Sequence, residues 1–375
     1  MAGGTIKKKV QSIFRCTGGL SGSKSNGVSK TGMIFQGSDE NFIENGRVLL
    51  EERVSLFHGK TNPINCLSTH DLNTNFEDWT WNDSFAGGSW YKCVWEGRPA
   101  LVKFFHNFKN ESKYELLLRC CREIVIATQM RIHKNVHKLL ACCLETEFPL
   151  LIYEYVEKES LLDRILSDGN QKLPALEWKD RLRIAWEISH AVAYLHSAFP
   201  RPIIHKGVTP SNVFLDQQNV AKLADFSYSV SIPEGTMCLE QQFVTGTFGY
   251  IPPEYLSHGK LVEKSDVYSF GVLVIVLLTG KSPESCDFGE DAPLLYSEKP
   301  KECKDLRKFL KQKHFSEIFD PVIITYGATA ANEDLFHQQL WALMEIAFRC
   351  IEYEEDSRPT MQEVSTELKT ILASS

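Results

Sequence analysis

Residues 203–216 read IIHKGVTPSNVFLD, and residues 224–227 read ADFS. In the first segment, two apolar runs that are typical of β-strands bracket a polar loop. The apolar run 213–215 is followed by a second run, 220–223, across a Gln-Gln-Asn turn, which predicts a β-hairpin. The sequence therefore predicts two polar loops, one on each side of a short hairpin.

A lysine and a glutamate further upstream are both expected to point toward the interior. Lys103 lies in a predicted strand, 100–105, where a buried ammonium group is costly unless it meets an anion. Glu123 lies on the apolar face of a predicted helix, 112–131, together with Leu116, Cys120, Ala127 and Met130. We therefore predict that Lys103 and Glu123 form a pair. The alternative is that either side chain extends to solvent.

In this order, the segments resemble those of protein kinases. Residues 203–216 resemble the catalytic loop, and residues 224–227 resemble the metal-binding loop. Residues 246–255, GTFGYIPPEY, are similar to the end of a plant kinase activation segment, and residues 264–272 to the helix that anchors the large lobe. The resemblance covers about residues 70–372. It implies an α+β, bilobal protein-kinase fold, with a small β-rich N-lobe and a larger helical C-lobe.

Two further segments extend this resemblance. Residues 357–361, SRPTM, resemble the segment whose arginine, here Arg358, pairs with the activation-segment glutamate, here Glu254. Residues 142–155, CCLETEFPLLIYEY, are typical of plant receptor-like kinases of the wall-associated kind. By this resemblance Tyr153 is the gatekeeper, and Glu154 to Val156 form the hinge that binds adenine.

Apolar periodicity along the chain agrees with this fold class. It predicts helices over residues 41–57, 112–131, 177–196, 264–279, 303–312 and 335–350. It predicts strands over 90–95, 100–105, 139–144 and 150–155, with a turn at 96–99. A sheet-rich half before a helical half is an α+β arrangement. We divide the chain into a flexible basic leader (1–40), an N-terminal flank (41–69), a kinase N-lobe with hinge (70–156) and a kinase C-lobe (157–372).

The catalytic loop, His205 to Thr209, departs from the kinase pattern at three positions. Gly207 stands where kinases have the aspartate that orients the attacking hydroxyl, and losing a general base typically costs about 10²- to 10⁴-fold in rate. Thr209 replaces a lysine, which removes positive charge where negative charge gathers. Lys206 replaces an arginine and loses the bidentate fork that grips a phosphorylated activation loop. The degenerate loop therefore indicates a pseudokinase.

The loop that cradles phosphate is also incomplete. Aligned on Val94, residues 87–94 read GGSWYKCV, and only the first of three glycines, Gly87, is kept. Lys92 then stands at the third glycine position, where it either clashes with a nucleotide or offers its ammonium group to a phosphate. The metal-binding loop has Ser227 in place of its glycine.

The other residues that hold nucleotide and Mg²⁺ in protein kinases are present. By resemblance, the nucleotide-binding candidates are Gly87, Lys103, Glu123, Glu154, Val156, Asn212 and Asp225, and the metal ligands are Asn212 and Asp225. Because loop glycines are lost, we expect binding of ATP and Mg²⁺ to be weak or absent. Two other hypotheses stay open. One is an atypical active Ser/Thr kinase without a carboxylate base, and the other is a non-catalytic switch that binds ATP.

The segment before the kinase-like region narrows the resemblance. Residues 44–52, ENGRVLLEE, and 59–64, GKTNPI, precede WYKCV at 90–94. This arrangement resembles plant receptor-like cytoplasmic pseudokinases that act as adaptors of a coiled-coil NLR immune receptor. The resemblance implies three kinds of partner, namely that receptor, receptor-like cytoplasmic kinases, and the pathogen effectors that modify them. Residues 227–247, rich in hydroxyl groups, are either a recognition face or an ordinary solvated loop.

Composition limits the remaining classes. The net charge is −7, which disfavours a nucleic-acid-binding protein. Residues 1–38 carry +6, so the leader is either a disordered tail or a basic amphipathic segment that contacts a membrane or a partner. The 11 cysteines contain no C-x-x-C pattern, which favours reduced thiols over disulfides or zinc. We expect a cytoplasmic location, at the inner face of the plasma membrane if the leader binds there.

Overall fold

The computed structural model describes residues 33–59, 62–85, 88–107, 111–156, 160–166, 175–281, 283, 315–327 and 333–374. The chain forms two compact units. Unit 1 holds residues up to 132 and 137–158, and unit 2 holds residues 133–136 and those from 159 onward. Most of the predicted leader, the predicted helix 303–312 and Gly87 lie outside the described residues.

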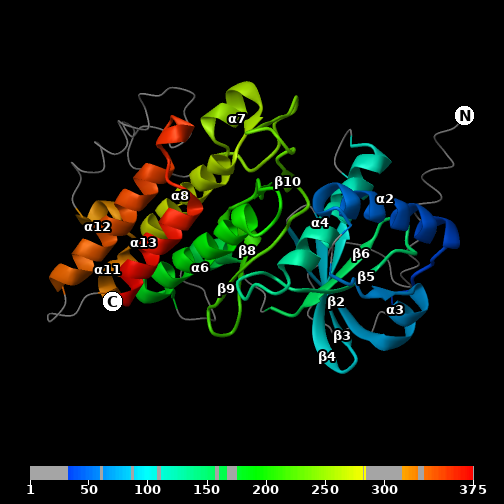
Figure 1. Ribbon diagram of the computed structural model, residues 1–375. Helices are drawn as coiled ribbons and strands as arrows, with labels where there is room; N and C mark the ends of the chain where they lie inside the picture. The colour runs from blue at the N-terminus through cyan, green and yellow to red at the C-terminus, as the bar shows by residue number, and fades with distance from the viewer. Residues whose placement is uncertain are drawn as a thin grey trace, which may run out of the picture. The chain divides into compact units, whose positions relative to one another are not determined.

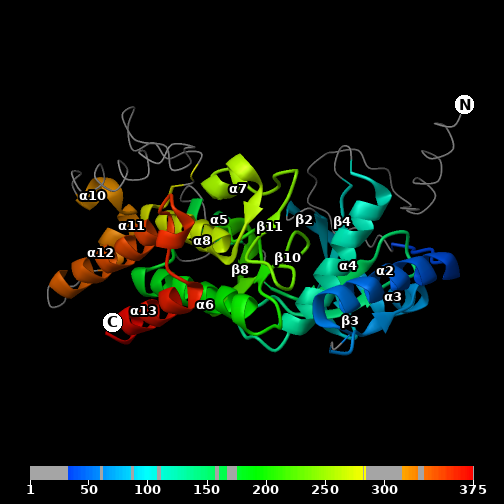
Figure 2. The same ribbon diagram turned by 45° about the horizontal axis from the view of Figure 1, so that its top comes forward.

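A six-stranded sheet forms the framework of unit 1, in the order β1-β5-β6-β4-β3-β2. Neighbouring strands are antiparallel except β1 and β5, which are parallel. The strands are β1 (Cys66–Leu67), β2 (Phe76–Phe85), β3 (Gly88–Trp95), β4 (Arg98–Phe105), β5 (Leu139–Cys143) and β6 (Leu150–Glu154). The helices are α2 (Asp39–Phe57), α3 (Thr69–Asn75) and α4 (Lys113–Met130), and Figures 1 and 2 show α2 lying beside α4.

The hairpin of β3 and β4 determines the position of Lys103. Its turn consists of Glu96 and Gly97, whose φ angles of 50° and 74° are both positive, as a two-residue type I′ turn requires. The predicted four-residue turn is therefore two residues long, and residues 98–99 belong to β4. This turn sets a register in which Trp90 lies directly opposite Lys103.

The two faces of the sheet differ in what they bury. Side chains alternate between faces along a strand, so Val102 and Phe104 lie on the face opposite to Lys103. That face carries a hydrophobic core, to which α3 contributes Leu72. Its other members are Phe35, Phe76, Trp79, Cys93, Ala100, Ala141, Cys143, Leu150 and Ile152. The face with Trp90 and Lys103 carries the candidate site of unit 1.

Strand β2 is not predicted from periodicity, and the structure gives the reason. Its pairing with β3 shifts register between Glu77 and Thr80 and again between Trp81 and Asp83. Such bulges add residues to one strand and break the alternation of side chains. The sequence pattern of β2 therefore does not follow the two-residue period of a regular strand.

A buried asparagine attaches α2 to the rest of unit 1. The Asn45 amide donates to the backbone oxygens of Leu144 and Thr146, at 2.8 Å each. The Cys121 thiol of α4 in turn lies 3.7 Å from the backbone oxygen of Asn45. Buried polar groups need such partners, so the predicted flank and the predicted N-lobe fold as one unit.

Unit 2 is predominantly helical. Its helices are α5 (Leu161–Leu166), α6 (Trp178–Ser197), α7 (Pro253–His258), α8 (Glu263–Thr279), α10 (Phe315–Ile318), α11 (Pro321–Gly327), α12 (Glu333–Cys350) and α13 (Met361–Ala373), with 3₁₀ turns η1 (Pro210–Asn212) and η2 (Glu355–Ser357). Its paired strands are β7 (Ile203–Ile204) with β10 (Val230–Ser231), β8 (Val213–Leu215) with β9 (Ala221–Leu223), and β11 (Leu239–Glu240) with β12 (Lys260–Leu261). Figure 1 shows α6, α8, α12 and α13 side by side.

Helix α8 lies at the centre of this helical core, and every residue from 265 to 279 is buried. A helix that is apolar on all sides must be surrounded in this way. The helices predicted over 177–196, 264–279 and 335–350 are confirmed as α6, α8 and α12, and the predicted hairpin as β8 and β9. Within the described residues, no helix is long and apolar enough to cross a membrane.

The eight cysteines that the structure describes are free thiols, and six of them are buried. Burial raises the pKa of Cys93 to about 12. Cys66 differs, because it is exposed and its Sγ lies 3.8 Å from the Sγ of Cys142. This contact, assisted by Arg53, lowers the pKa of Cys66 to about 7.

We expect iodoacetamide to alkylate Cys66 well before Cys93. The thiolate is the reactive form, so the rate at Cys66 should rise as the pH increases through about 7 and level off above it. Peptide mass spectrometry over a pH series measures both rates. Cys66→Ser should remove the early adduct, whereas Cys93→Ser should leave it unchanged. Equal rates at the two cysteines in the folded protein would contradict this prediction.

Candidate functional site

Lys103 of β4 and Glu123 of α4 form the ion pair that the sequence predicts. Nζ of Lys103 lies 2.7 Å from Oε2 of Glu123, and neither side chain is exposed to solvent. Tyr153 of β6 donates its hydroxyl to the other carboxylate oxygen, Oε1, at 2.5 Å. The alternative in which either side chain extends to solvent is therefore wrong. A buried ion pair needs such additional hydrogen bonds, because removing two charges from water is costly.

Aromatic rings enclose this pair. The Lys103 ammonium lies 5.5 Å from the ring centroid of Trp90 and 4.6 Å from that of Phe105. The Tyr153 ring in turn lies 5.3 Å from that of Trp90 and 4.7 Å from that of His137, between centroids. Trp90 and His137 are not among the site residues that the sequence predicts, although a tryptophan within the predicted phosphate loop, 87–94, is a signal that this place is filled.

The hinge residues predicted by resemblance also lie in unit 1. Nε2 of His137 lies 2.9 Å from the backbone oxygen of Glu154, and Val156 is buried. The Glu154 carboxylate accepts a hydrogen bond from the backbone N–H of Lys138 at 3.3 Å. Because a carbonyl oxygen can only accept, Nε2 is the protonated nitrogen of the His137 ring.

Lys92 is engaged by the hinge. It lies opposite Leu101 in the β3–β4 register, on the same sheet face as Trp90. Its ammonium group lies 3.2 Å from the hydroxyl of Tyr155 and 4.5 Å from the centroid of that ring. The two outcomes predicted for Lys92 both placed it at the phosphates. In the structure, Lys92 makes a cation–π contact with Tyr155 instead. The residue of β3 that lies against Lys103 is Trp90.

In unit 2, Asp266 of α8 holds the loop that follows β7. Its carboxylate accepts from the backbone N–H of His205 at 2.7 Å and from that of Lys206 at 2.9 Å. The Asn212 side-chain amide donates to the backbone oxygen of Gly207 at 3.0 Å. Lys206 has a φ of 65°, in the left-handed region that most residues avoid. The hydrogen bonds on both sides of it keep the loop in this conformation.

The loop offers no carboxylate at its centre. A Cβ built on Gly207 would lie 2.9 Å from Nδ2 of Asn212, so even a small side chain there must displace the amide. Burial lowers the pKa of His205, and its Nδ1 accepts from the backbone N–H of Gly207 at 3.1 Å. The hydroxyl of Thr209 lies 2.9 Å from that of Ser211. The neutral His205 is therefore committed to the backbone, and Thr209 contributes no charge.

Asn212 and Asp225 are the residues of unit 2 that could hold Mg²⁺. The backbone N–H of Ala224 donates to the backbone oxygen of Asn212 at 2.9 Å, which joins the two polar loops. Oδ1 of Asp225 accepts the hydroxyl of Ser227 at 2.7 Å, a bond that the usual glycine cannot make. Oxygen ligands of this kind suit Mg²⁺, which takes its other ligands from water and phosphate. Among the described residues, no group of three or more His, Cys, Asp or Glu is arranged to hold a metal ion.

Lys206 binds neutral groups of the activation segment. Its ammonium group donates to Oε1 of Gln241 at 2.7 Å and to the hydroxyl of Thr245 at 2.9 Å, and it lies 5.1 Å from the ring centroid of Tyr255. The Tyr255 hydroxyl also accepts from the backbone N–H of Thr245 at 3.0 Å. The segment is thus ordered by uncharged partners at the position where the kinase pattern places a phosphate receptor.

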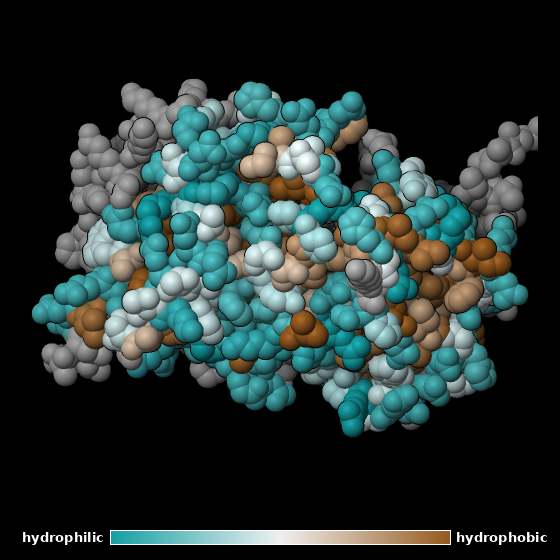
Figure 3. Space-filling view, viewed as in Figure 1, coloured by the Kyte–Doolittle hydropathy of each residue, from teal (hydrophilic) through white to brown (hydrophobic). Residues whose placement is uncertain are grey.

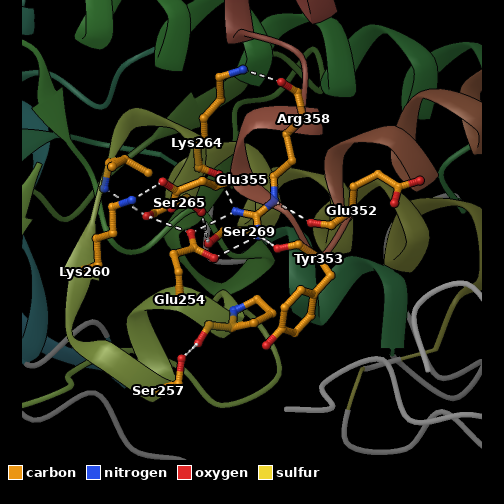
Figure 4. Close-up of polar contacts among 12 residues, drawn as sticks. Glu254, Ser257, Lys260, Lys264, Ser265, Ser269, Glu352, Tyr353, Glu355 and Arg358 are labelled. Atoms are coloured by element: carbon orange, nitrogen blue, oxygen red, sulfur yellow. Dashed lines mark hydrogen bonds and ion pairs between the residues drawn. The ribbon is translucent and has the colours of Figure 1, made fainter. Parts of the chain in front are cut away.

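Glu254 and Arg358 form the ion pair implied by the resemblance, shown in Figure 4. Nη1 and Nη2 of Arg358 donate to the two carboxylate oxygens of Glu254 at 2.9 and 2.8 Å. The remaining donors reach the backbone oxygens of Glu352, Tyr353 and Lys264, at 2.7, 3.0 and 3.1 Å. All five N–H donors of the guanidinium group are therefore used.

Comparisons with known proteins agree with this geometry. Residues 86–368 match the family model "Protein kinase domain". The Arabidopsis thaliana protein "Non-functional pseudokinase ZED1" is 38% identical over 336 residues, which cover 88% of this chain and 95% of that protein. "Serine/threonine-protein kinase ZRK1" from the same plant is 35% identical over 341 residues, 89% of this chain and 92% of that protein. "Wall-associated receptor kinase-like 4" is 34% identical, over 89% of this chain and 41% of that longer protein. The chain therefore belongs to the protein kinase family, among the plant receptor-like cytoplasmic kinases and pseudokinases.

Proposed function

We propose that this protein is a catalytically impaired, kinase-like adaptor in plant innate immune signalling. In this role it bridges a coiled-coil NLR immune receptor and receptor-like cytoplasmic kinases that a pathogen effector has modified. The observation that carries the proposal is an exposed apolar face on α2. Ile43, Leu50 and Val54 follow one side of this helix and are 68%, 58% and 53% exposed. Figure 3 shows hydrophobic colour gathered over and beside α2.

Helix α2 is apolar on two sides. Val48, Leu49 and Leu56 are buried on its inner side. A surface helix ordinarily needs one apolar face, which it buries against its own domain. A second, exposed apolar face indicates contact with another protein. We assign this second face to the NLR.

A separate exposed surface lies on unit 2. Met237 and Phe243 are 89% and 80% exposed, and Phe248 is exposed beside them in the chain. They belong to or adjoin the segment 227–247, which Lys206 and Tyr255 hold in place. An ordered loop that presents aromatic side chains suits recognition of a second protein. We assign this surface to the client kinase, so that the two partners contact different units.

The catalytic loop supports an impaired rather than an active enzyme. Gly207 provides no carboxylate, and Thr209 provides no positive charge near the transferring phosphate. Each loss removes a group that acts in the transition state. An adaptor needs surfaces that bind its partners, and it does not need a working catalytic loop.

Replacing the α2 face should abolish receptor binding. We expect Ile43→Glu/Leu50→Glu to weaken the affinity for the NLR by at least about 100-fold, because two carboxylates must lose their hydration in an apolar interface. The NLR is first captured from plant tissue with the wild-type protein, and its affinity is then measured by surface plasmon resonance. Ile132→Glu is the matched control, because Ile132 is an exposed isoleucine of unit 1 outside α2. Equal losses in both variants, or recovery of no NLR even after effector challenge, would refute the proposal.

The second candidate function is an atypical Ser/Thr kinase. It is favoured by the retained Lys103, Asn212 and Asp225 and by the name of the relative ZRK1. Incubating the purified protein with Mg-ATP distinguishes the two candidates. Autophosphorylation by the wild-type protein that is lost in Lys103→Ala, in a variant that circular dichroism shows to be folded, would show that the protein is an active kinase.

A further inference from the structure

Three aromatic side chains of unit 1 gather on the sheet face that carries Lys103. Trp90 lies opposite Lys103 in the strand register, and its ring centroid is 5.3 Å from that of Tyr153 and 5.9 Å from that of His137. His137 and Tyr153 stack at 4.7 Å with 23° between their planes. We call Trp90, His137 and Tyr153 the aromatic cluster. Its members are 1%, 0% and 2% exposed, so they pack with no room for solvent between them.

The aromatic cluster lies where a nucleotide base would have to bind in unit 1. Lys103 and the hinge, Glu154 to Val156, are the residues that a nucleotide would contact from this unit. The cluster contacts both of them, Lys103 through Trp90 and the backbone oxygen of Glu154 through His137 at 2.9 Å. An indole ring and an adenine base are both planar bicycles of similar size. The His137 ring already occupies one of the two lone pairs of this oxygen, which an adenine amine would have to approach.

The Lys103 ammonium group is not available to a phosphate either. Its side chain is 0% exposed, and it is bound by Glu123 at 2.7 Å and flanked by the rings of Trp90 and Phe105. In addition, a Cβ on Gly88 would lie 3.2 Å from the Lys103 side chain, so the strand before Trp90 already lies close over it. Because the side chain is fully enclosed, a phosphate could reach the ammonium group only if the groups around it moved.

We infer that the aromatic cluster occupies the position of the adenine base and excludes ATP from unit 1. The Lys103–Glu123 pair is then a structural link between the sheet and α4 instead of a nucleotide anchor. The residues present do not fit the nucleotide that the family binds. This inference is independent of the adaptor role, because an adaptor that binds ATP would refute the exclusion and leave the adaptor role intact.

Direct binding to the full-length protein tests the exclusion. In isothermal titration calorimetry, we expect Mg-ATP not to saturate the wild-type protein. The Kd is then weaker than about 1 mM. Trp90→Val/His137→Val removes the indole and the imidazole while keeping apolar side chains, and should tighten binding by about tenfold or more. Trp81→Val is the matched control, because Trp81 is an exposed tryptophan of β2 outside the cluster, and it should bind no more tightly than the wild type.

A second readout does not depend on the stability of the double variant. An acyl-phosphate derivative of ATP transfers its acyl group to a lysine amine beside the bound phosphates, and mass spectrometry locates the acylated lysine. We expect Lys103 to stay unlabelled in the wild-type protein. Labelling of wild-type Lys103 that excess ATP prevents would overturn the inference, as would a wild-type melting temperature raised by millimolar Mg-ATP.

Discussion

Replacing Arg358 with alanine is expected to lower the free energy of unfolding by about 3–5 kcal/mol. The substitution leaves the Glu254 carboxylate without its bidentate partner, at a side chain that is only 12% exposed. It also removes the donors to three backbone oxygens, those of Glu352, Tyr353 and Lys264. A partly buried acceptor that loses its donor carries part of the desolvation penalty of that group. Urea unfolding followed by circular dichroism measures the loss.

Two further variants separate the guanidinium geometry from its charge. Arg358→Lys keeps the charge but cannot form the bidentate pair or reach all three carbonyls, so it should recover only part of the loss. Arg349→Ala is the matched control, because Arg349 pairs with Glu367 at side chains that are 40% and 43% exposed. It should cost less than about 1 kcal/mol. Equal costs for Arg358→Ala and Arg349→Ala would contradict the prediction.

Replacing Lys103 with methionine is expected to have a comparable effect on stability, about 3–5 kcal/mol. Methionine keeps the apolar stem but removes the ammonium group that offsets the charge of the Glu123 carboxylate, which is 0% exposed. The Tyr153 hydroxyl still donates to this carboxylate. The measurement is again urea unfolding, without added nucleotide.

The double variant Lys103→Met/Glu123→Gln provides the critical control. Glutamine carries no charge and still accepts the Tyr153 hydroxyl, so the double variant should recover most of the stability that Lys103→Met loses. Uncharged replacements of a buried ion pair are often close to neutral. If Lys103→Met costs less than about 1 kcal/mol, the pair is not the structural link that we infer.

Local sequence patterns were sufficient to predict most of the framework. The helices at 112–131 and 177–196 follow from a 3.6-residue period, and the hairpin at 213–223 from two apolar runs across a turn. Helical spacing alone also placed Glu123 on the inner face of α4, which leads to its pairing with Lys103. These features depend on residues that are close to one another in the chain, so they can be predicted from local sequence patterns.

The surroundings of the candidate site could not be predicted in this way. Aligning the phosphate loop on Val94 placed Lys92 at the phosphates, but the short type I′ turn shifts the register so that Trp90 faces Lys103 and Lys92 reaches Tyr155. His137 becomes important only because β5 and β6 bring it against Tyr153 and Glu154. Shortening the turn from the predicted four residues to two changes every pair across the hairpin.

What the catalytic loop lacks follows from its residues alone. No folding can supply a carboxylate at Gly207 or an ammonium group at Thr209, because a missing functional group is a property of the residue and not of its environment. What the retained residues do depends instead on how the chain folds around them. Lys103 and Glu123 have the same side chains in a nucleotide site and in a buried structural link. The difference lies in whether solvent and ligand can reach them, and that depends on Trp90 and His137, which strand pairing brings to the same face.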